Sequence, residues 1–245
     1  MNKKIIVTTS WDDGHKLDRK LALLLKKYNI KGTLYVSPLN HEFAKKDLLS
    51  KIDMVSLSKN FEIGAHTMHH LHLSQIPLQL ADKEIRDSKK YLENIIHKRV
   101  QSFCYPYGDY NENIAKLVEK NGFLLARTTK RYSFVLPDNL FSIPTTFHTY
   151  NHYSDIHKVL QFSGLHVSRI LRYTSWDNLA KDLFDYTAEK KTVFHLWGHS
   201  WEFEKFNSWE KLENVFRYIA NRKNVYYMSN AEAALWANEH KKQQY

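Results

Sequence analysis

The sequence predicts an α/β fold in which parallel strands alternate with helices. Short runs of β-branched and aromatic residues recur along the 245-residue chain, and an amphipathic helical pattern follows most of them. No repeat, linker or low-complexity stretch interrupts this alternation. Strand-then-helix units form parallel sheets through right-handed crossovers, so an open sheet or a barrel would fit. In both, functional side chains lie at the C-terminal ends of the strands.

The elements follow one another in regular order. The first strand is predicted at 5–10, where the run IIVTTS is β-branched, and the helix after it has one apolar face. Residues 130–175, with two prolines and several aromatics, predict no clear element. Ser229 and Glu232 have the spacing of a capping box and open the last helix. The other expected elements are a helix at 17–28, a strand at 33–37, a helical region in the forties and fifties, a strand at 61–66, a helix at 78–97, a strand at 101–106, a helix at 111–121, a strand at 123–128, a helix at 176–189, a strand at 192–199, a helix at 208–222 and a strand at 224–229.

Composition narrows the class of protein. With 43% hydrophobic residues, we expect one domain spanning 1–245. The single cysteine, Cys104, and the absence of an apolar run after Met1 lead us to expect a cytoplasmic protein. A net charge of +10 favours anionic partners. The Lys and Arg residues are scattered and accompany no recognition motif, so no nucleic-acid partner is expected.

Acids and histidines stand where strands are predicted to end. Asp12 and Asp13 follow the first strand, and His66 and His70 follow the strand at 61–66. If the chain turns helical after His66, the two imidazoles share one face about 6 Å apart, with His69 facing away. One carboxylate and two imidazoles leave open positions on a cation, which is typical of a catalytic zinc-type site. Alone, an Asp-Asp-Gly run is also a common turn and helix cap.

Four segments together resemble the polysaccharide deacetylases of carbohydrate esterase family 4. Residues 10–14, SWDDG, are similar to the Thr-Phe-Asp-Asp-Gly motif, and residues 66–70, HTMHH, match His-Ser/Thr-x-x-His. Residues 104–108, CYPYG, are similar to Arg-x-Pro-Tyr/Phe-Gly, and residues 195–199, HLWGH, contain the final Leu-x-His motif in altered form. The resemblance covers most of the chain and implies a deformed parallel (β/α) barrel with about seven strands, similar to a TIM barrel.

The resemblance also implies roles for individual residues. Asp12 would be the general base, His199 the general acid, and the backbone N–H of Tyr107 the donor that holds the oxyanion. One divalent metal ion, expected to be zinc, would be held by the metal ligands Asp13, His66 and His70. The pleat of a strand independently supports two roles for adjacent acids, because neighbouring side chains point in different directions.

Two departures from the family pattern lead to further hypotheses. Cys104 stands where many members have the arginine that pairs with the catalytic aspartate, and Arg127 on a neighbouring strand could replace it. His195 competes with His199 for the role of acid, and the strand-end position favours His199. Glu202 and Asp109 could orient one or other imidazole or line the substrate site, and Trp197 and Trp201, which flank His199, could cover a sugar ring.

We therefore expect a metal-dependent hydrolase that removes an N-acetyl or N-formyl group from an amino sugar. A cytoplasmic enzyme would act on an anionic nucleotide-linked or lipid-linked precursor of a surface polysaccharide or lipopolysaccharide, with peripheral contact at the inner membrane face. Two alternatives stay open. The chain could be a catalytically silent carbohydrate-binding protein on the same barrel, or an amidase that acts on a non-sugar amide.

Overall fold

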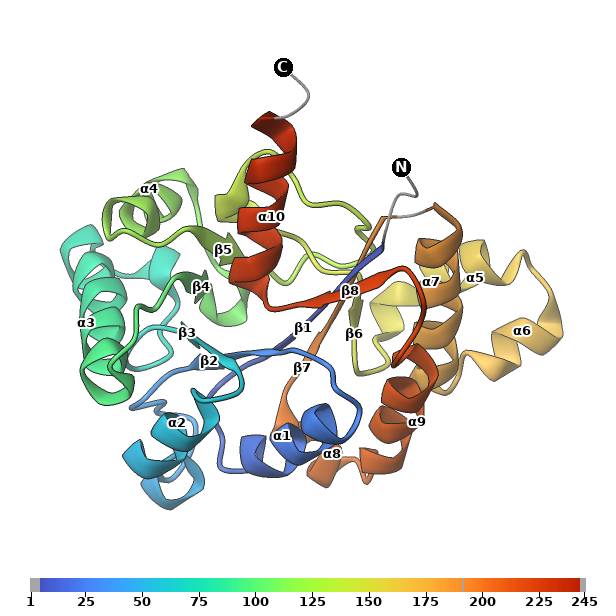
Figure 1. Ribbon diagram of the computed structural model, residues 1–245, viewed down its shortest axis with the longest axis horizontal. Coiled ribbons are helices and arrows are strands. Elements are labelled where there is room, and N and C mark those ends of the chain that lie inside the picture. Colours follow the sequence, from blue (N-terminus) through green and yellow to red (C-terminus); the bar gives the residue numbers. More distant parts are fainter. Residues whose placement is uncertain (1–4, 191, 243–245) are drawn as a thin grey trace.

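The computed structural model describes residues 5–190 and 192–242, and its strands form one parallel sheet (Figure 1). Neighbouring strands run in the order β5-β4-β3-β2-β1-β7-β6, and β8 pairs with β1. The strands are β1 Ile5–Trp11, β2 Thr33–Val36, β3 Glu62–Ala65, β4 Ser102–Cys104, β5 Leu125–Arg127, β6 Phe147–His148, β7 Val193–Gly198 and β8 Val225–Met228.

The sheet curls into a barrel that the segment from Ile143 to His148 completes. Ile143 forms a parallel bridge with Arg127 of β5, and β6 at the end of this segment pairs with β7. β8 lies outside this ring and pairs with the N-terminal half of β1. The last two residues of β1 pair with β2. The prediction of a deformed parallel barrel with about seven strands is confirmed.

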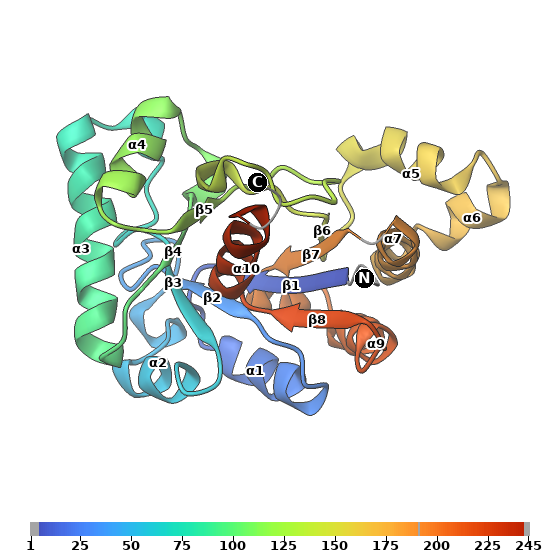
Figure 2. The same cartoon turned by 45° about the horizontal axis from the view of Figure 1, so that its top comes forward.

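Helices cover the outside of the barrel (Figures 1 and 2). Their apolar faces pack on a core of buried aliphatic and aromatic side chains, as the amphipathic patterns predict. The α-helices are α1 Asp18–Lys27, α2 Lys51–Leu57, α3 Leu78–Ile96, α4 Glu112–Lys120, α5 Ile156–Ser163, α6 Val167–Arg172, α7 Trp176–Lys190, α8 Ser200–Lys205, α9 Trp209–Ile219 and α10 Asn230–Lys242. Short 3₁₀ turns lie at η1 Lys45–Asp47, η2 Leu73–Gln75, η3 Pro106–Gly108, η4 Leu140–Ser142 and η5 Tyr153–Asp155.

The structure adds elements that the sequence pattern did not predict. The stretch 130–175, which gave no clear element, contains β6, α5 and α6, and α6 lies far from the barrel axis in Figure 2. The short helix α8 begins directly after His199, where only a strand end was expected. The capping box at Ser229 and Glu232 is present, with Ser229 N donating to Glu232 Oε2 at 2.8 Å.

Candidate active site and metal centre

Asp12 ends the ladder of β1 and is buried against Arg127. An Nη2 hydrogen of Arg127 is donated to Asp12 Oδ1. Cys104 and Arg127 are register partners on β4 and β5, and Cys104 Sγ lies 3.7 Å from Asp12 Oδ2. Burial alone would raise the pKa of Asp12, but the positive charge and hydrogen bond of Arg127, together with His66 and His199, hold this pKa below its usual value. The guanidinium thus reaches the aspartate from the strand beside the one that carries the motif in the family.

Asp13 faces two imidazoles in the same buried corner. Its Oδ1 lies 3.8 Å from His66 Nε2 and 3.3 Å from His70 Nε2, and the two rings are 4.9 Å apart. This buried Oδ1 makes no hydrogen bond. A buried carboxylate oxygen without a hydrogen-bond partner is costly unless a cation balances it.

The chemistry of these three groups fits a divalent metal ion. His66 Nδ1 is 2.8 Å from the Cys104 carbonyl oxygen, so it donates there and leaves the Nε2 lone pair directed at Asp13. His70 Nδ1 lies 2.9 Å from Glu42 Oε2. Burial lowers the pKa of both imidazoles, that of His66 to about 3, so both are neutral ligands at pH 7. One carboxylate and two neutral imidazoles form a donor set for zinc or a similar ion.

The two histidines converge by a different route from the one expected. The prediction of a helical turn after His66 is wrong, because Thr67 and His70 have φ values of +61° and +62°. The loop is instead held by buried Glu84 of α3, which accepts hydrogen bonds from the backbone N–H groups of Met68 and His69, each at 3.0 Å. The side chain of His69 turns to Glu84 and away from Asp13, and this contact was not foreseen.

His199 lies across the site from the metal ligands, at the end of β7. Its Nδ1 is 2.9 Å from Glu202 Oε2, and the same oxygen is 3.1 Å from His148 Nε2. Burial would lower the pKa of His199, but the charges of Asp13 and Glu202 outweigh it and raise this pKa to about 9. These two carboxylates therefore favour the protonated form of the imidazole at the strand end.

His195 occupies a deeper level of the barrel. Its Nε2 lies 2.8 Å from Ser10 Oγ, and burial lowers its pKa to about 3. Its position below the site makes it a poorer candidate acid than His199. Gly198 allows the strand to pass close to its neighbour, because an added Cβ there would lie 2.0 Å from Thr149 Oγ1.

The predicted substrate-site residues have mixed outcomes. Trp197 is only 4% exposed and stacks on His148 at 4.0 Å, so its predicted role as a sugar platform is wrong. Asp109 orients neither His195 nor His199, because it accepts hydrogen bonds from the backbone and side chain of Ser74. Trp201 Nε1 donates to Asp13 Oδ2 at 2.7 Å, which leaves its partly exposed ring beside His199.

Tyr107 lies at the edge of the two-histidine loop. It has a φ of +57°, its ring stacks on His72 at 3.8 Å, and it is half exposed. Burial and a hydrogen bond to Glu42 raise the pKa of its hydroxyl. The role of its backbone N–H toward an oxyanion stays a prediction.

Sequence reasoning missed His148, which completes the acid side of the site. His148 ends β6 and joins Glu202 to His152, whose Nε2 is 2.6 Å from His148 Nδ1. The only signal was the spacing of two histidines four residues apart in a stretch without a clear pattern. Parallel pairing of β6 with β7 brings this segment to Glu202, and local sequence does not reveal that pairing.

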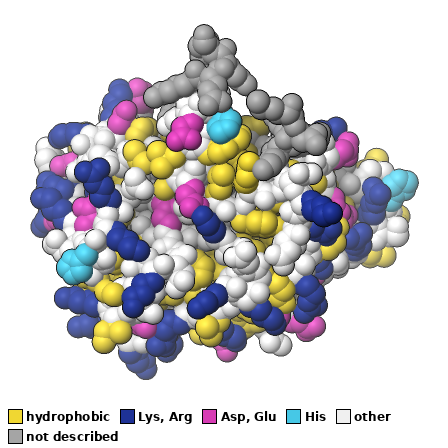
Figure 3. All heavy atoms as spheres, in the orientation of Figure 1, with side chains coloured by type: hydrophobic (Ala, Val, Ile, Leu, Met, Phe, Trp, Pro, Cys, Tyr) yellow, Lys and Arg dark blue, Asp and Glu magenta, His cyan; other side chains and the backbone are white. Residues whose placement is uncertain are grey.

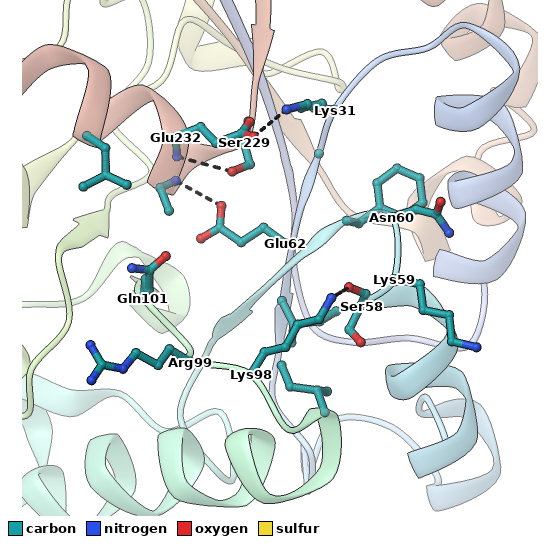
Figure 4. A pocket seen from close by; sticks show the side chains of 16 residues that line it. Lys31, Ser58, Lys59, Asn60, Glu62, Lys98, Arg99, Gln101, Ser229 and Glu232 are labelled. Carbon is teal, nitrogen blue, oxygen red and sulfur yellow. Dashed lines mark hydrogen bonds and ion pairs between the residues drawn. The ribbon is translucent and has the colours of Figure 1, made fainter.

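A different pocket, shown in Figure 4, lies at the other end of the strands. Its lining includes residues that precede β2, β3 and β4 and the beginning of α10. Glu62 at its centre accepts hydrogen bonds from Thr33, Ser102 and the backbone of Ala231, so it anchors α10 to the sheet. We attribute this pocket to the packing of α10 against the sheet. It is separate from the site at the C-terminal ends of the strands.

This structure is an α/β barrel with acids and imidazoles gathered at the C-terminal ends of its strands. A sequence model of the family described as polysaccharide deacetylase matches residues 1–126. The chain belongs to this family.

Individual proteins also match part of the chain in sequence. YxkH of Bacillus subtilis, assigned to the polysaccharide deacetylases, is 32% identical over 126 residues, covering 51% of this chain and 44% of that protein. The poly-β-1,6-N-acetyl-D-glucosamine N-deacetylase of Staphylococcus epidermidis is 30% identical over 129 residues, covering 47% of this chain and 44% of that protein. The chain thus matches less than half the length of these two relatives.

A solved structure shows the same fold over nearly the whole chain. It belongs to a Mycobacterium smegmatis protein assigned to the polysaccharide deacetylases, and it matches with a TM-score of 0.71 at 16% identity, covering 98% of this chain and 92% of that one. In the part of the chain that the structure describes, no helix combines the length and the apolar character needed to cross a bilayer.

Proposed function

We propose that this chain is a metal-dependent deacylase that hydrolyses the N-acetyl or N-formyl group of an amino sugar. The observation that carries the proposal is the meeting of Asp13, His66 and His70 around an unbonded carboxylate oxygen, next to the arginine-held Asp12. The named activity of the Staphylococcus epidermidis relative supports an N-acylated amino sugar as the substrate class.

The chain's own residues can carry each proton that the hydrolysis moves. Asp12, kept ionised by Arg127, would accept a proton from the water that attacks the amide carbon. The backbone N–H of Tyr107 would donate to the oxyanion that develops on the carbonyl oxygen. As the C–N bond breaks, protonated His199 would give its proton to the departing nitrogen, so the products are a carboxylate and a free amino sugar.

A divalent cation held by Asp13, His66 and His70 would, when bound, act as a Lewis acid on the amide carbonyl. Zinc is the expected ion because the donor set combines imidazole and carboxylate groups. Arg127 and Trp201 orient the two neighbouring acids in different directions, so base and ligand stay separate. This division of roles matches the one expected for two successive residues at a strand end.

For the substrate we propose an anionic, nucleotide-linked or lipid-linked amino sugar. The net charge of +10 supports an anionic substrate, since long-range attraction raises the rate of encounter. Lys and Arg side chains are spread over the face seen in Figure 3, with no single strip that would follow a nucleic-acid backbone. A cytoplasmic location, expected from the single cysteine, would supply such precursors of surface polysaccharides.

The test is release of acetate or formate from a panel of N-acylated amino sugars. We expect the protein, purified without a chelator or histidine tag, to contain about one divalent ion and to release acid from at least one sugar. Chelation should abolish release, and adding the metal back should restore it. Asp12→Asn should lower turnover by about 10³-fold with the metal retained, since general base catalysis contributes on the order of 10²–10⁴-fold.

The control is Asp47→Asn, which breaks a surface pair with Lys16. Silence on every sugar by metal-loaded protein would favour the carbohydrate-binding alternative. Release only from non-sugar amides would favour the amidase. Release that persists after complete removal of the metal would contradict the proposed mechanism.

A further inference from the structure

A projecting part of the molecule carries a concentration of exposed hydrophobic side chains. We name η5, α5 and α6, residues 153–172, the α5–α6 hairpin; it extends away from the barrel in Figure 2. Three of its exposed hydrophobic residues, Leu165, Val167 and Leu171, lie on α6 or just before it and are 72%, 69% and 64% exposed. Val167 and Leu171 are four residues apart on α6 and therefore share one face. Tyr153 and Ile156 add further exposed apolar surface at the base of the hairpin.

The exposed charges on the hairpin itself are basic, and Arg172 at its end pairs with Asp182 of α7. Between positions 139 and 176 the sequence contains a single acid, Asp155. Asp155 is buried, where it accepts hydrogen bonds from Arg131 and Tyr132. Lys158 and Arg169 are exposed on the hairpin. The right-hand edge in Figure 3 shows hydrophobic side chains next to basic ones and a histidine. Apolar side chains with exposed basic neighbours such as Lys158 and Arg169 suit an anionic lipid surface.

The hairpin also adjoins the acid side of the candidate active site. A cavity of about 610 Å³ lies between the hairpin and the barrel, lined largely by aromatic and aliphatic side chains. His152 belongs to this lining and contacts His148, which is hydrogen-bonded to Glu202. A surface that held the hairpin would therefore lie close to the residues that hold His199.

We propose that the α5–α6 hairpin docks the protein on an anionic lipid bilayer. Leu165, Val167 and Leu171 enter the interfacial region, and Lys158 and Arg169 pair with lipid phosphates. This inference rests on the proposed function only for its purpose, which is to bring the active site to lipid-linked amino sugars. Binding to a bilayer needs neither metal nor turnover, so the two proposals can fail separately.

The experiment is sedimentation of the protein with vesicles of phosphatidylcholine containing 30% phosphatidylglycerol, and with pure phosphatidylcholine. We expect binding to the anionic vesicles that weakens between 0.1 M and 0.5 M NaCl, because salt screens exposed charges. The triple variant Leu165→Ser, Val167→Ser, Leu171→Ser should bind at least about tenfold more weakly, since each buried CH₂ group contributes to partitioning. Its activity on a water-soluble substrate and its Tm should match those of the wild type.

A matched triple variant controls for loss of exposed hydrophobic surface in general. It carries Leu23→Ser, Ile52→Ser and Leu78→Ser on α1, α2 and α3, whose side chains are also exposed. We expect this control to bind within about twofold of the wild type. The proposal is overturned if the wild type does not prefer anionic vesicles, or if the hairpin variant and the control bind equally. A change in oligomeric state of the hairpin variant without lipid, accompanied by unchanged vesicle binding, would identify the face as a contact between copies instead and would also overturn it.

Discussion

The two halves of the chain contribute different things to one site. Residues up to 126, the half that the family model matches, provide Asp12, Asp13 and the two histidines that face them. The second half provides the groups that hold those acids. Arg127 binds Asp12, and Trp201 binds Asp13. Neither acid of the first half is oriented by its own half alone.

This difference between the halves shows how a residue on a neighbouring strand can replace a missing motif residue. Cys104 removes the arginine expected on β4, and Arg127 supplies a guanidinium from the register position beside it on β5. The guanidinium carbon lies 4.7 Å from the Trp197 ring, so an aromatic face of the second half also supports the charge. Mutations can therefore separate the contribution of the candidate metal ligands in the first half from that of the supporting residues in the second half.

Among variants of the supporting residues, the largest effect should come from Arg127→Ala. Asp12 would lose its charged partner in a buried site, so we expect turnover to fall by about 10²–10³-fold, the order of a general base's contribution. Metal affinity should change less than about tenfold, since outer partners of a ligand typically contribute 10–100-fold and Arg127 binds the acid that is not a ligand. Steady-state kinetics and metal titration measure the two quantities.

Two further variants make that result specific. Cys104→Arg combined with Arg127→Ala moves the guanidinium back to β4, and we expect it to recover part of the turnover. Arg131→Ala breaks another arginine–aspartate pair, with Asp155, and should leave turnover nearly unchanged. If Arg127→Ala lowers metal affinity and turnover by the same factor, Arg127 supports the metal site as a whole. The contributions of the two halves would then not be separable.

Glu202→Gln should have the next largest effect, on the pH dependence of kcat/KM. A general acid must hold its proton, so activity falls as pH rises through the pKa of His199. Burial lowers that pKa, whereas the charges of Asp13 and Glu202 raise it to about 9. Removing the charge of Glu202 should move the basic limb of the profile to lower pH by about one unit, as neighbouring charges typically do.

The control for this shift is Glu204→Gln, on the same helix but exposed and bonded to Trp209. We expect its basic limb to coincide with that of the wild type. A limb that stays in place in Glu202→Gln would mean that His199 does not donate the proton that limits the rate.

The sequence was sufficient for the fold and for the meeting of the candidate metal ligands, and insufficient for the residues that contact them. Strand-end placement of Asp13, His66 and His70 follows from periodicity, because parallel strands bring their C-terminal ends together. Arg127 was foreseen for the same reason. His148 and Glu84 were not, since their contacts depend on pairing of β6 with β7 and on the packing of α3. The loop after His66 was misread because a positive φ is uncommon for Thr and for most His residues, so the residue types at 67 and 70 do not predict it.

The smallest effect should come from Trp201→Phe, which tests the second link between the halves. The substitution keeps an aromatic ring and removes the N–H that Asp13 Oδ2 accepts at 2.7 Å. Asp13 would still face His66 and His70 through Oδ1, so we expect metal affinity to fall by about fivefold, below the 10–100-fold typical of an outer partner, with kcat of the metal-saturated enzyme nearly unchanged.

Competition with a chromophoric chelator measures that affinity. Trp209→Phe is the matched control, because Trp209 Nε1 donates to the exposed carboxylate of Glu204 at the same 2.7 Å. We expect no change in metal affinity there, since Glu204 does not reach the site. If Trp201→Phe lowers kcat and leaves affinity intact, the ring acts on the substrate beside His199, and the second half then supports the first through Arg127 but not through Trp201.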